Sequence, residues 1–332
     1  MMPLRRSLFG LYGFLLAGNL AAWAWALLVF GDRPLLLGTA LLAYGFGLRH
    51  AVDADHIAAI DNVTRKLMQE GQRPITVGFF FALGHSTVVT LASAGVAVSA
   101  TLLAGHFEWL KAVGGLIGTS VSALFLFAIA GANLVVLHSI WRTMRSVRRG
   151  GAYVEQDFDL LLNSRGFLAR LFRPVFGLVR RSWHMFPLGF LFGLGFDTAT
   201  EVALLGISAT EAAKGMSVWS IMVFPALFAA GMSLIDTTDG VLMLGAYNWA
   251  FVKPMRKLTY NFTITLVSVV VAVMVGGVEL LGLLGDRLNL AGGVWTIVDR
   301  LGDASGSLGL VVMLAFMAAW ICSIVVYRYK GL

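Results

Sequence analysis

The sequence predicts an all-helical protein that crosses a membrane several times, and three observations support this prediction. Of its 332 residues, 58% are apolar and only 13% are charged, whereas a soluble domain has about 25% charged residues. Eight apolar runs are long enough to cross a bilayer as helices, which takes about 20 residues each. Glycine is frequent, at 38 residues, as in helices that pack closely within lipid. We therefore expect an all-α polytopic membrane protein with a single transmembrane domain over residues 1–332.

The eight predicted transmembrane helices follow one another along the chain. They occupy residues 8–30, 35–60, 75–103, 112–138, 186–207, 218–244, 259–284 and 307–327. The first run follows Arg5 and Arg6 and contains Ala22-Trp23-Ala24, features shared with a cleavable signal peptide. Its apolar stretch continues without a polar break to Phe30, which is too long for such a peptide, so a retained helix is predicted.

The distribution of basic residues predicts how these helices are oriented. With both termini in the cytoplasm, the cytoplasmic segments carry 19 lysines and arginines and the outer segments carry five, while Arg49 lies inside the second helix. Because basic residues are enriched in cytoplasmic loops, cytoplasmic N- and C-termini are predicted. This topology accounts for the net charge of +7, and no nucleic-acid partner is expected.

Residues 139–185 form one long basic cytoplasmic loop between the fourth and fifth predicted helices. Within this loop, residues 167–173 mix arginine with large apolar side chains. That composition favours an amphipathic helix lying in the plane of the membrane, and a solvated basic loop is the alternative.

Four of the predicted helices carry polar clusters. Ionisable side chains are costly in hydrocarbon and usually mark an ion or substrate path. Each cluster lies roughly 10 to 15 residues from the start of its helix, hence near the middle of the bilayer, so the four clusters should meet at one level. They comprise His50, Asp53, Asp55 and His56 in the second helix, His85, Ser86 and Thr87 in the third, Asp197, Thr198, Thr200 and Glu201 in the fifth, and Asp236, Thr237, Thr238 and Asp239 in the sixth.

The cluster in the second helix is a candidate metal site. Imidazole and carboxylate groups are ligands that divalent first-row metals accept. The carboxylates in the membrane outnumber the single arginine there, so a bound cation, protons or both must balance the excess charge. On a regular helix His50, Asp53 and His56 share a face and Asp55 does not, so ligation by Asp55 requires a break in the helix. His85 is a further candidate ligand, with hydrogen-bonded packing as its alternative role.

The other polar residues in the membrane are predicted to line the path, to take protons or to join helices. They are Arg49, Ser86, Asn133, Asp197, Thr198, Glu201, Asp236 and Asp239. The single cysteine, Cys322, excludes an internal disulfide and any cysteine-based zinc or iron–sulfur centre. No Gly-x-x-x-x-Gly-Lys-Ser/Thr loop occurs, so no ATPase function is expected within this chain.

Four motifs resemble those of the nickel/cobalt transporter (NiCoT) family. They are HAVDADH at residues 50–56, which matches the family's HX4DH signature, FALGHSTVV at residues 81–89, LGFDTATE at residues 194–201 and GMSLIDTTD at residues 231–239. Their order, the eight helices and the long loop after the fourth helix extend the resemblance over nearly the whole chain. In this family the residues matched by His50, Asp55 and His56 are implicated in metal recognition.

The resemblance implies a secondary permease that imports Ni2+, Co2+ or both across a bacterial cytoplasmic (inner) membrane. The metal ion and the lipid bilayer are then the expected partners, the metal is a substrate, and no cofactor is expected. An efflux permease is one alternative, although related efflux proteins often carry histidine-rich loops, which this sequence lacks. An intramembrane metalloenzyme is a second alternative, but zinc proteases of that kind need His-Glu-x-x-His, and the motif is absent. An importer, not an enzyme, is therefore predicted.

Overall fold

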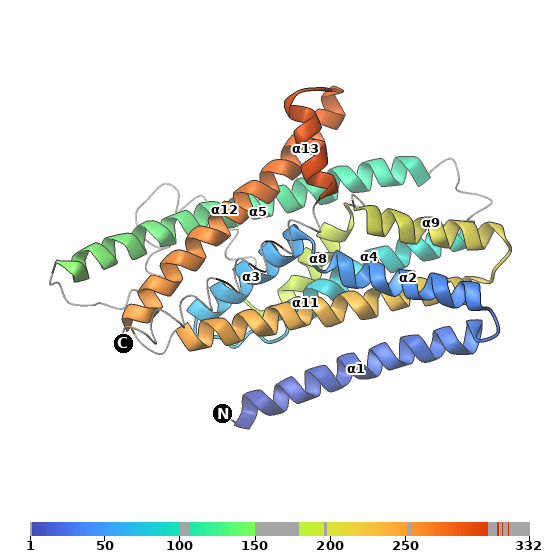
Figure 1. Ribbon diagram of the computed structural model, residues 1–332, viewed down its shortest axis with the longest axis horizontal. Coiled ribbons are helices and arrows are strands. Elements are labelled where there is room, and N and C mark those ends of the chain that lie inside the picture. The colour runs from blue at the N-terminus through green and yellow to red at the C-terminus, as the bar shows by residue number, and fades with distance from the viewer. Residues whose placement is uncertain are drawn as a thin grey trace. The chain divides into compact units, whose positions relative to one another are not determined.

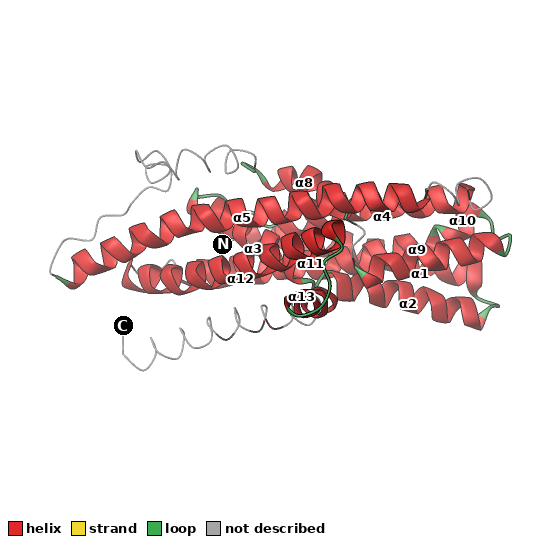
Figure 2. Ribbon diagram, turned by 90° about the horizontal axis from the view of Figure 1, so that it is seen from above, coloured by secondary structure: helices red, strands yellow, loops and turns green. Residues whose placement is uncertain are grey.

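The computed structural model describes residues 2–99, 107–149, 179–195, 198–250 and 254–304, together with the isolated positions Val311, Leu314 and Ala318. All regular structure in these ranges is helical, as predicted (Figures 1 and 2). The last predicted helix, over residues 307–327, and most of the long basic loop lie outside the described residues.

The helices are α1 (Met2–Phe30), α2 (Pro34–His50), α3 (Ala54–Gln69), α4 (Val77–Ser99), α5 (Phe107–Arg148), α8 (Met185–Gly193), α9 (Ala199–Ala213), α10 (Val218–Ile221), α11 (Val223–Ala250), α12 (Pro254–Leu288) and α13 (Val294–Asp303), with a 3-10 turn η1 (Ser182–His184). Within the described ranges, five helices are long and apolar enough to cross a membrane, or six if α2 and α3 together form one span. A multi-pass membrane protein is thus supported, while the number of eight helices and the orientation of the termini stay predictions.

The second predicted helix, over residues 35–60, is interrupted inside its polar cluster. α2 ends at His50 and α3 begins at Ala54. In between, the N–H groups of Val52 and Asp53 bond to carbonyls three residues back, at 3.1 and 2.9 Å, instead of the four residues of an α-helix. Such tightening is typical of a helix end. The break is the one that ligation by Asp55 would require.

The fifth predicted helix, over residues 186–207, is also interrupted at its polar cluster, because α8 ends at Gly193 and α9 begins at Ala199. Several predicted boundaries differ from the structure. α5 continues to Arg148, ten residues into the segment predicted as the long basic loop. α3 continues to Gln69 and carries two buried basic residues, Arg65 at 1% and Lys66 at 6% exposure. The segment between the last two predicted helices contains a further helix, α13.

The chain divides into two compact units. The first unit contains Met1–Asp53, Ile75–Val121 and Trp183–Thr238, and the second contains Ala54–Pro74, Ser122–Ser182 and Asp239–Leu332. The division falls within the break between α2 and α3. His50 and Asp53 therefore belong to the first unit, whereas Asp55 and His56 belong to the second.

Close contacts between helices in the first unit depend on glycine. A Cβ atom on Gly84 of α4 would lie 2.0 Å from the carbonyl oxygen of Phe186 in α8, and one on Gly47 of α2 would lie 2.1 Å from that of Phe228 in α11. Any larger residue would force these backbones apart, as is usual where small residues let membrane helices approach. Gly84 directly precedes His85 and Gly47 lies three residues before His50, so the close packing positions both histidines.

Candidate metal centre

His50 is the last residue of α2, and its side chain is 1% exposed. Its Nδ1 lies 2.9 Å from Oδ2 of Asp53, and its Nε2 lies 2.8 Å from Nε2 of His85. A carboxylate that accepts a hydrogen bond from Nδ1–H fixes the tautomer in which Nε2 keeps its lone pair, which is a common arrangement behind metal-binding histidines. Asp53 can therefore orient His50 so that Nε2 is available as a ligand.

Glu201 of α9 brings a carboxylate to the same two histidines. Its Oε1 lies 2.9 Å from Nε2 of His85 and 3.8 Å from Nε2 of His50. His85 is 3% exposed and Glu201 is 1% exposed, so the three groups are removed from water. They come from α4, α9 and α2, all in the first unit. Two imidazole nitrogens and one carboxylate oxygen thus converge on one point.

The spacing of these three atoms suits a single divalent ion. With bonds of about 2.1 Å, neighbouring ligand atoms lie about 3.0 Å apart in octahedral geometry and about 3.4 Å apart in tetrahedral geometry. The observed separations of 2.8, 2.9 and 3.8 Å bracket both values. We therefore describe His50, His85 and Glu201 as the candidate metal centre.

The break between α8 and α9 holds Glu201 in place. Thr198 is the N-cap residue of α9, and Glu201 lies in the first turn of this helix, where the helix dipole stabilises a negative charge. The hydroxyl of Thr198 donates a hydrogen bond of 3.0 Å to Oε2 of Glu201, which leaves Oε1 directed to the histidines. The hydroxyls of Thr198 and Thr200 also lie 3.3 Å from Nδ1 of His50.

The second oxygen of Asp53 gives an independent indication of a polar ligand. Asp53 is 1% exposed, and its Oδ1 has no hydrogen-bond partner among the residues that the structure describes. A buried carboxylate oxygen without a partner is costly. A cation or its bound water near this atom would remove that cost.

Three other candidate residues of the second predicted helix differ in their exposure. Arg49 is exposed. Asp55 is partly exposed in the first turn of α3, where a carboxylate stabilises the positive end of the helix dipole. His56 is fully buried in the same turn and belongs to the second unit with Asp55.

The candidates in the other helices occupy varied positions. Ser86 is buried and donates a hydrogen bond of 2.5 Å to the carbonyl of Ala82, within α4. Asp236 and Asp239 are both buried in α11, the first in the first unit and the second in the second unit. Asp197 lies outside the described residues.

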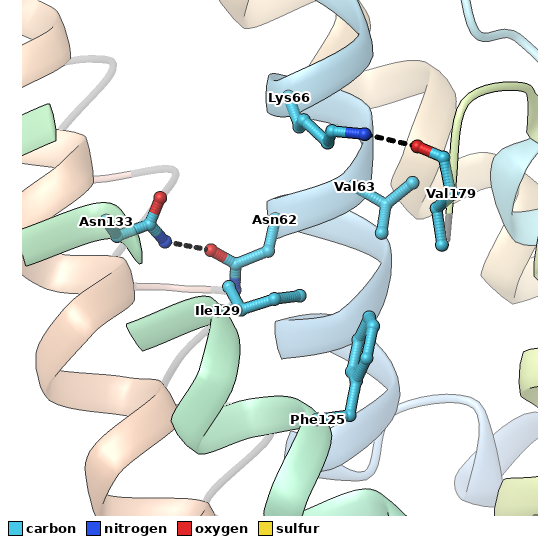
Figure 3. Close-up of a pocket in the computed structure, with 7 residues that line it drawn as sticks. All are labelled: Asn62, Val63, Lys66, Phe125, Ile129, Asn133 and Val179. Carbon is cyan, nitrogen blue, oxygen red and sulfur yellow. Dashed lines mark hydrogen bonds between the residues drawn. The ribbon is translucent and has the colours of Figure 1, made fainter. Parts of the chain in front are cut away.

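Asn133 of α5 lies in the second unit, at a small pocket (Figure 3). Its Nδ2 donates a hydrogen bond of 2.6 Å to Oδ1 of Asn62 in α3. At the same pocket the ammonium of Lys66 donates to the carbonyl of Val179. The full lining consists of Asn62, Val63, Lys66, Phe125, Ile129, Asn133 and Val179. The hydrogen bond from Asn133 to Asn62 joins α5 to α3.

A buried carboxylate that the sequence analysis did not single out also lies in the second unit. Asp61 of α3 is completely buried. It accepts a hydrogen bond of 2.5 Å from Tyr247 in α11 and one of 2.8 Å from Ser268 in α12. Both carboxylate oxygens are therefore occupied by hydroxyl donors, and α3 is fastened to two other helices.

Arg65, one helical turn after Asp61, continues this network. Its guanidinium donates hydrogen bonds of 2.6 Å to Thr265 of α12 and 2.7 Å to Asn62. Its positive charge stabilises the negative charge of Asp61. The spacing of four residues between Asp61 and Arg65 places them on one face of a helix. That spacing was the available signal in the sequence, but the predicted helix ended at Ile60 and left both residues beyond it.

Comparisons with known proteins agree with one another. A profile for the family described as "High-affinity nickel-transport protein" (NicO) matches residues 36–326. A Cupriavidus necator protein named "High-affinity nickel transport protein" is 62% identical over 98% of this chain and 93% of its own length. The Bradyrhizobium diazoefficiens protein HupN, named for hydrogenase nickel incorporation, is 58% identical over 96% of this chain and 83% of its own. The cobalt transport protein NhlF of Rhodococcus rhodochrous is 42% identical over 86% and 81%. No solved structure matches.

Proposed function

This chain belongs to the high-affinity nickel-transport family, and we propose that it imports Ni2+ across the cytoplasmic membrane as a secondary transporter. The NiCoT resemblance of its motifs is thereby confirmed, and so is the expectation of a transport protein instead of an enzyme. The observation that carries the proposal is the convergence of His50 Nε2, His85 Nε2 and Glu201 Oε1 inside an apolar chain. This donor set can replace water molecules around a divalent ion.

The proposed binding step exchanges water on the ion for protein ligands. His50 and His85 supply imidazole nitrogens, which suit nickel and cobalt. Glu201 supplies a carboxylate that offsets one positive charge, and Asp53 orients His50. His56, only three residues after Asp53, is proposed as a further ligand, and ligation by Asp55 stays a prediction from the family signature.

The membrane potential supports the proposed inward direction of transport. An inside-negative potential favours inward movement by about 2.3 kcal/mol per charge per 100 mV, hence about 4.6 kcal/mol for a divalent ion. We propose Co2+ as a second substrate because a relative is named a cobalt transport protein and because both ions accept nitrogen and oxygen ligands. An excess of Co2+ should then lower Ni2+ uptake.

Uptake of radioactive Ni2+ into expressing cells tests the proposal. His50→Ala and His85→Ala should each reduce uptake to the level of cells without the protein. His138→Ala is the matched control, because this histidine is exposed on α5 and should leave uptake unchanged. Wild-type uptake in both ligand variants, with normal protein levels, would contradict the assignment.

Growth on toxic nickel distinguishes import from efflux. Expression of an importer should make cells more sensitive to nickel, whereas expression of an efflux permease should protect them. Protection by the wild-type protein, abolished by His50→Ala, would replace import with efflux while leaving the metal centre in place.

A further inference from the structure

α13 is an amphipathic helix of ten residues that begins six residues after the end of α12. At 100° per residue its apolar side chains fall on one side of the helix and its polar side chains on the other. The apolar side consists of Val294, Trp295, Ile297, Val298 and Leu301, and the polar side includes Thr296, Asp299 and Arg300. Such a helix needs an apolar partner along the whole of its apolar side.

Part of that side is covered by α12. The ring of Trp295 lies directly against Gly285, where an added Cβ atom would be 3.2 Å from the ring, and Val298 is 5% exposed. Gly292 and Gly293 have φ values of 81° and 53°, a left-handed conformation that glycine adopts without strain. These residues reverse the chain so that α13 is held at the end of α12 (Figure 1).

The other part of the apolar side is exposed. Val294 is 67% exposed and Ile297 is 58% exposed. On α12, Leu284 and Leu288 are also exposed, at 40% and 62%, and they belong to a candidate membrane span that runs from Thr265 to Leu288. The exposed edge of α13 therefore continues the surface that α12 presents to lipid.

We propose that α13 is a membrane-surface helix whose Val294/Ile297 edge is inserted into the interfacial region of the phospholipid bilayer. The candidate span of α12 ends at Leu288, and only a short turn separates this residue from α13. α13 therefore begins close to the bilayer surface. The polar side would then face water. Asp299 and Arg300 carry opposite charges, so insertion depends on apolar contact and not on anionic headgroups. The helix in this way fixes the outer end of α12 at the level of the membrane surface.

Position-specific fluorescence in proteoliposomes tests this inference. Single cysteines are placed at Ile297 and, as a matched control on the polar side, at Asp299, both in a Cys322→Ser background that retains Ni2+ uptake. Each is labelled with a polarity-sensitive dye. A quencher attached to lipid near the headgroup should quench the dye at position 297 at least about three-fold more than at position 299, and aqueous iodide should show the reverse order.

Three results would overturn the inference. Equal access of iodide to both positions would mean that α13 lies in water. A dye at position 297 that neither quencher reaches would mean that protein, such as residues 305–332 or a second copy of the chain, covers the edge. Quenching that appears only with anionic lipid would mean that headgroup charge, not apolar insertion, holds the helix. Uptake by the labelled variants serves as the measure of correct folding.

Discussion

The candidate metal centre of the first unit and the Asp61–Arg65 network of the second unit are both buried polar clusters, but they differ in their chemistry. The candidate metal centre of the first unit joins two imidazoles to the carboxylate of Glu201. In the second unit, the carboxylate of Asp61 accepts hydrogen bonds from two hydroxyl groups. The nearby guanidinium of Arg65 donates to a hydroxyl and to an amide oxygen. The first cluster consists of groups of the kinds that bind divalent metals. In the second, the charge of the carboxylate is balanced within the protein. Burial of a carboxylate in a membrane protein therefore does not by itself identify a cation site.

The same chemical change, carboxylate to amide, should affect different properties in the two places: stability in the second unit and metal affinity in the first. The largest expected effect is loss of stability in the second unit. Asp61→Asn leaves Arg65 buried without its counter-charge, which costs about 3–5 kcal/mol. Thermal unfolding in detergent should show a lower Tm, and the double variant Asp61→Asn/Arg65→Gln should recover more than half of the loss. A double variant no more stable than the single one would contradict charge balance as the role of this pair.

In the first unit, Glu201→Gln should instead act on metal binding. The amide keeps the size of the side chain but loses the charge that attracts the cation, so Ni2+ affinity should fall about 100-fold, which corresponds to about 2.7 kcal/mol. Equilibrium dialysis of the purified protein with radioactive Ni2+ measures this, and Tm is expected to stay close to wild type. A fall in Tm with unchanged affinity would place Glu201 in the same class as Asp61.

A smaller effect on affinity is expected from Asp53, which contacts His50 instead of completing the triangle of ligand atoms. Asp53→Ala should weaken Ni2+ binding about 10-fold, at the lower end of the range that is typical when the partner of a ligating histidine is removed. The same dialysis assay measures it. A loss equal to that of His50→Ala would indicate that Asp53 is a ligand in its own right.

The smallest effect is expected from Tyr247, which supplies one of two hydroxyl donors to Asp61. Tyr247→Phe removes this donor and keeps the ring, so the free energy of unfolding should fall by about 1.5 kcal/mol, with Ni2+ affinity unchanged. Added to Asp61→Asn, the same substitution should cost clearly less than it does in the wild type. Full additivity would mean that the hydroxyl does not act through Asp61.

The sequence was sufficient to predict the helical class and to single out His50 and His85 as candidates, because composition and local spacing carry that information. His50 and His85 were candidate ligands, and the geometry of Asp55 indicated where a break in the helix would be needed. Glu201 was expected to line the path at the level of the histidines. Its direct contact with His85 was not predicted, because the two residues are 116 positions apart and the contact depends on a second break before α9. The burial of Arg65 was missed because a basic residue after an apolar run usually marks the end of a membrane helix, whereas here partners on α12 and α3 satisfy it.

X-ray absorption at the nickel edge on the purified, Ni2+-loaded protein tests the central claim most directly. We predict nitrogen and oxygen neighbours at about 2.1 Å, with an imidazole contribution that decreases by one ring in both His50→Ala and His85→Ala and is unchanged in His138→Ala. Sulfur neighbours, or an imidazole contribution that His50→Ala and His85→Ala leave intact, would contradict the assignment of the metal to His50, His85 and Glu201.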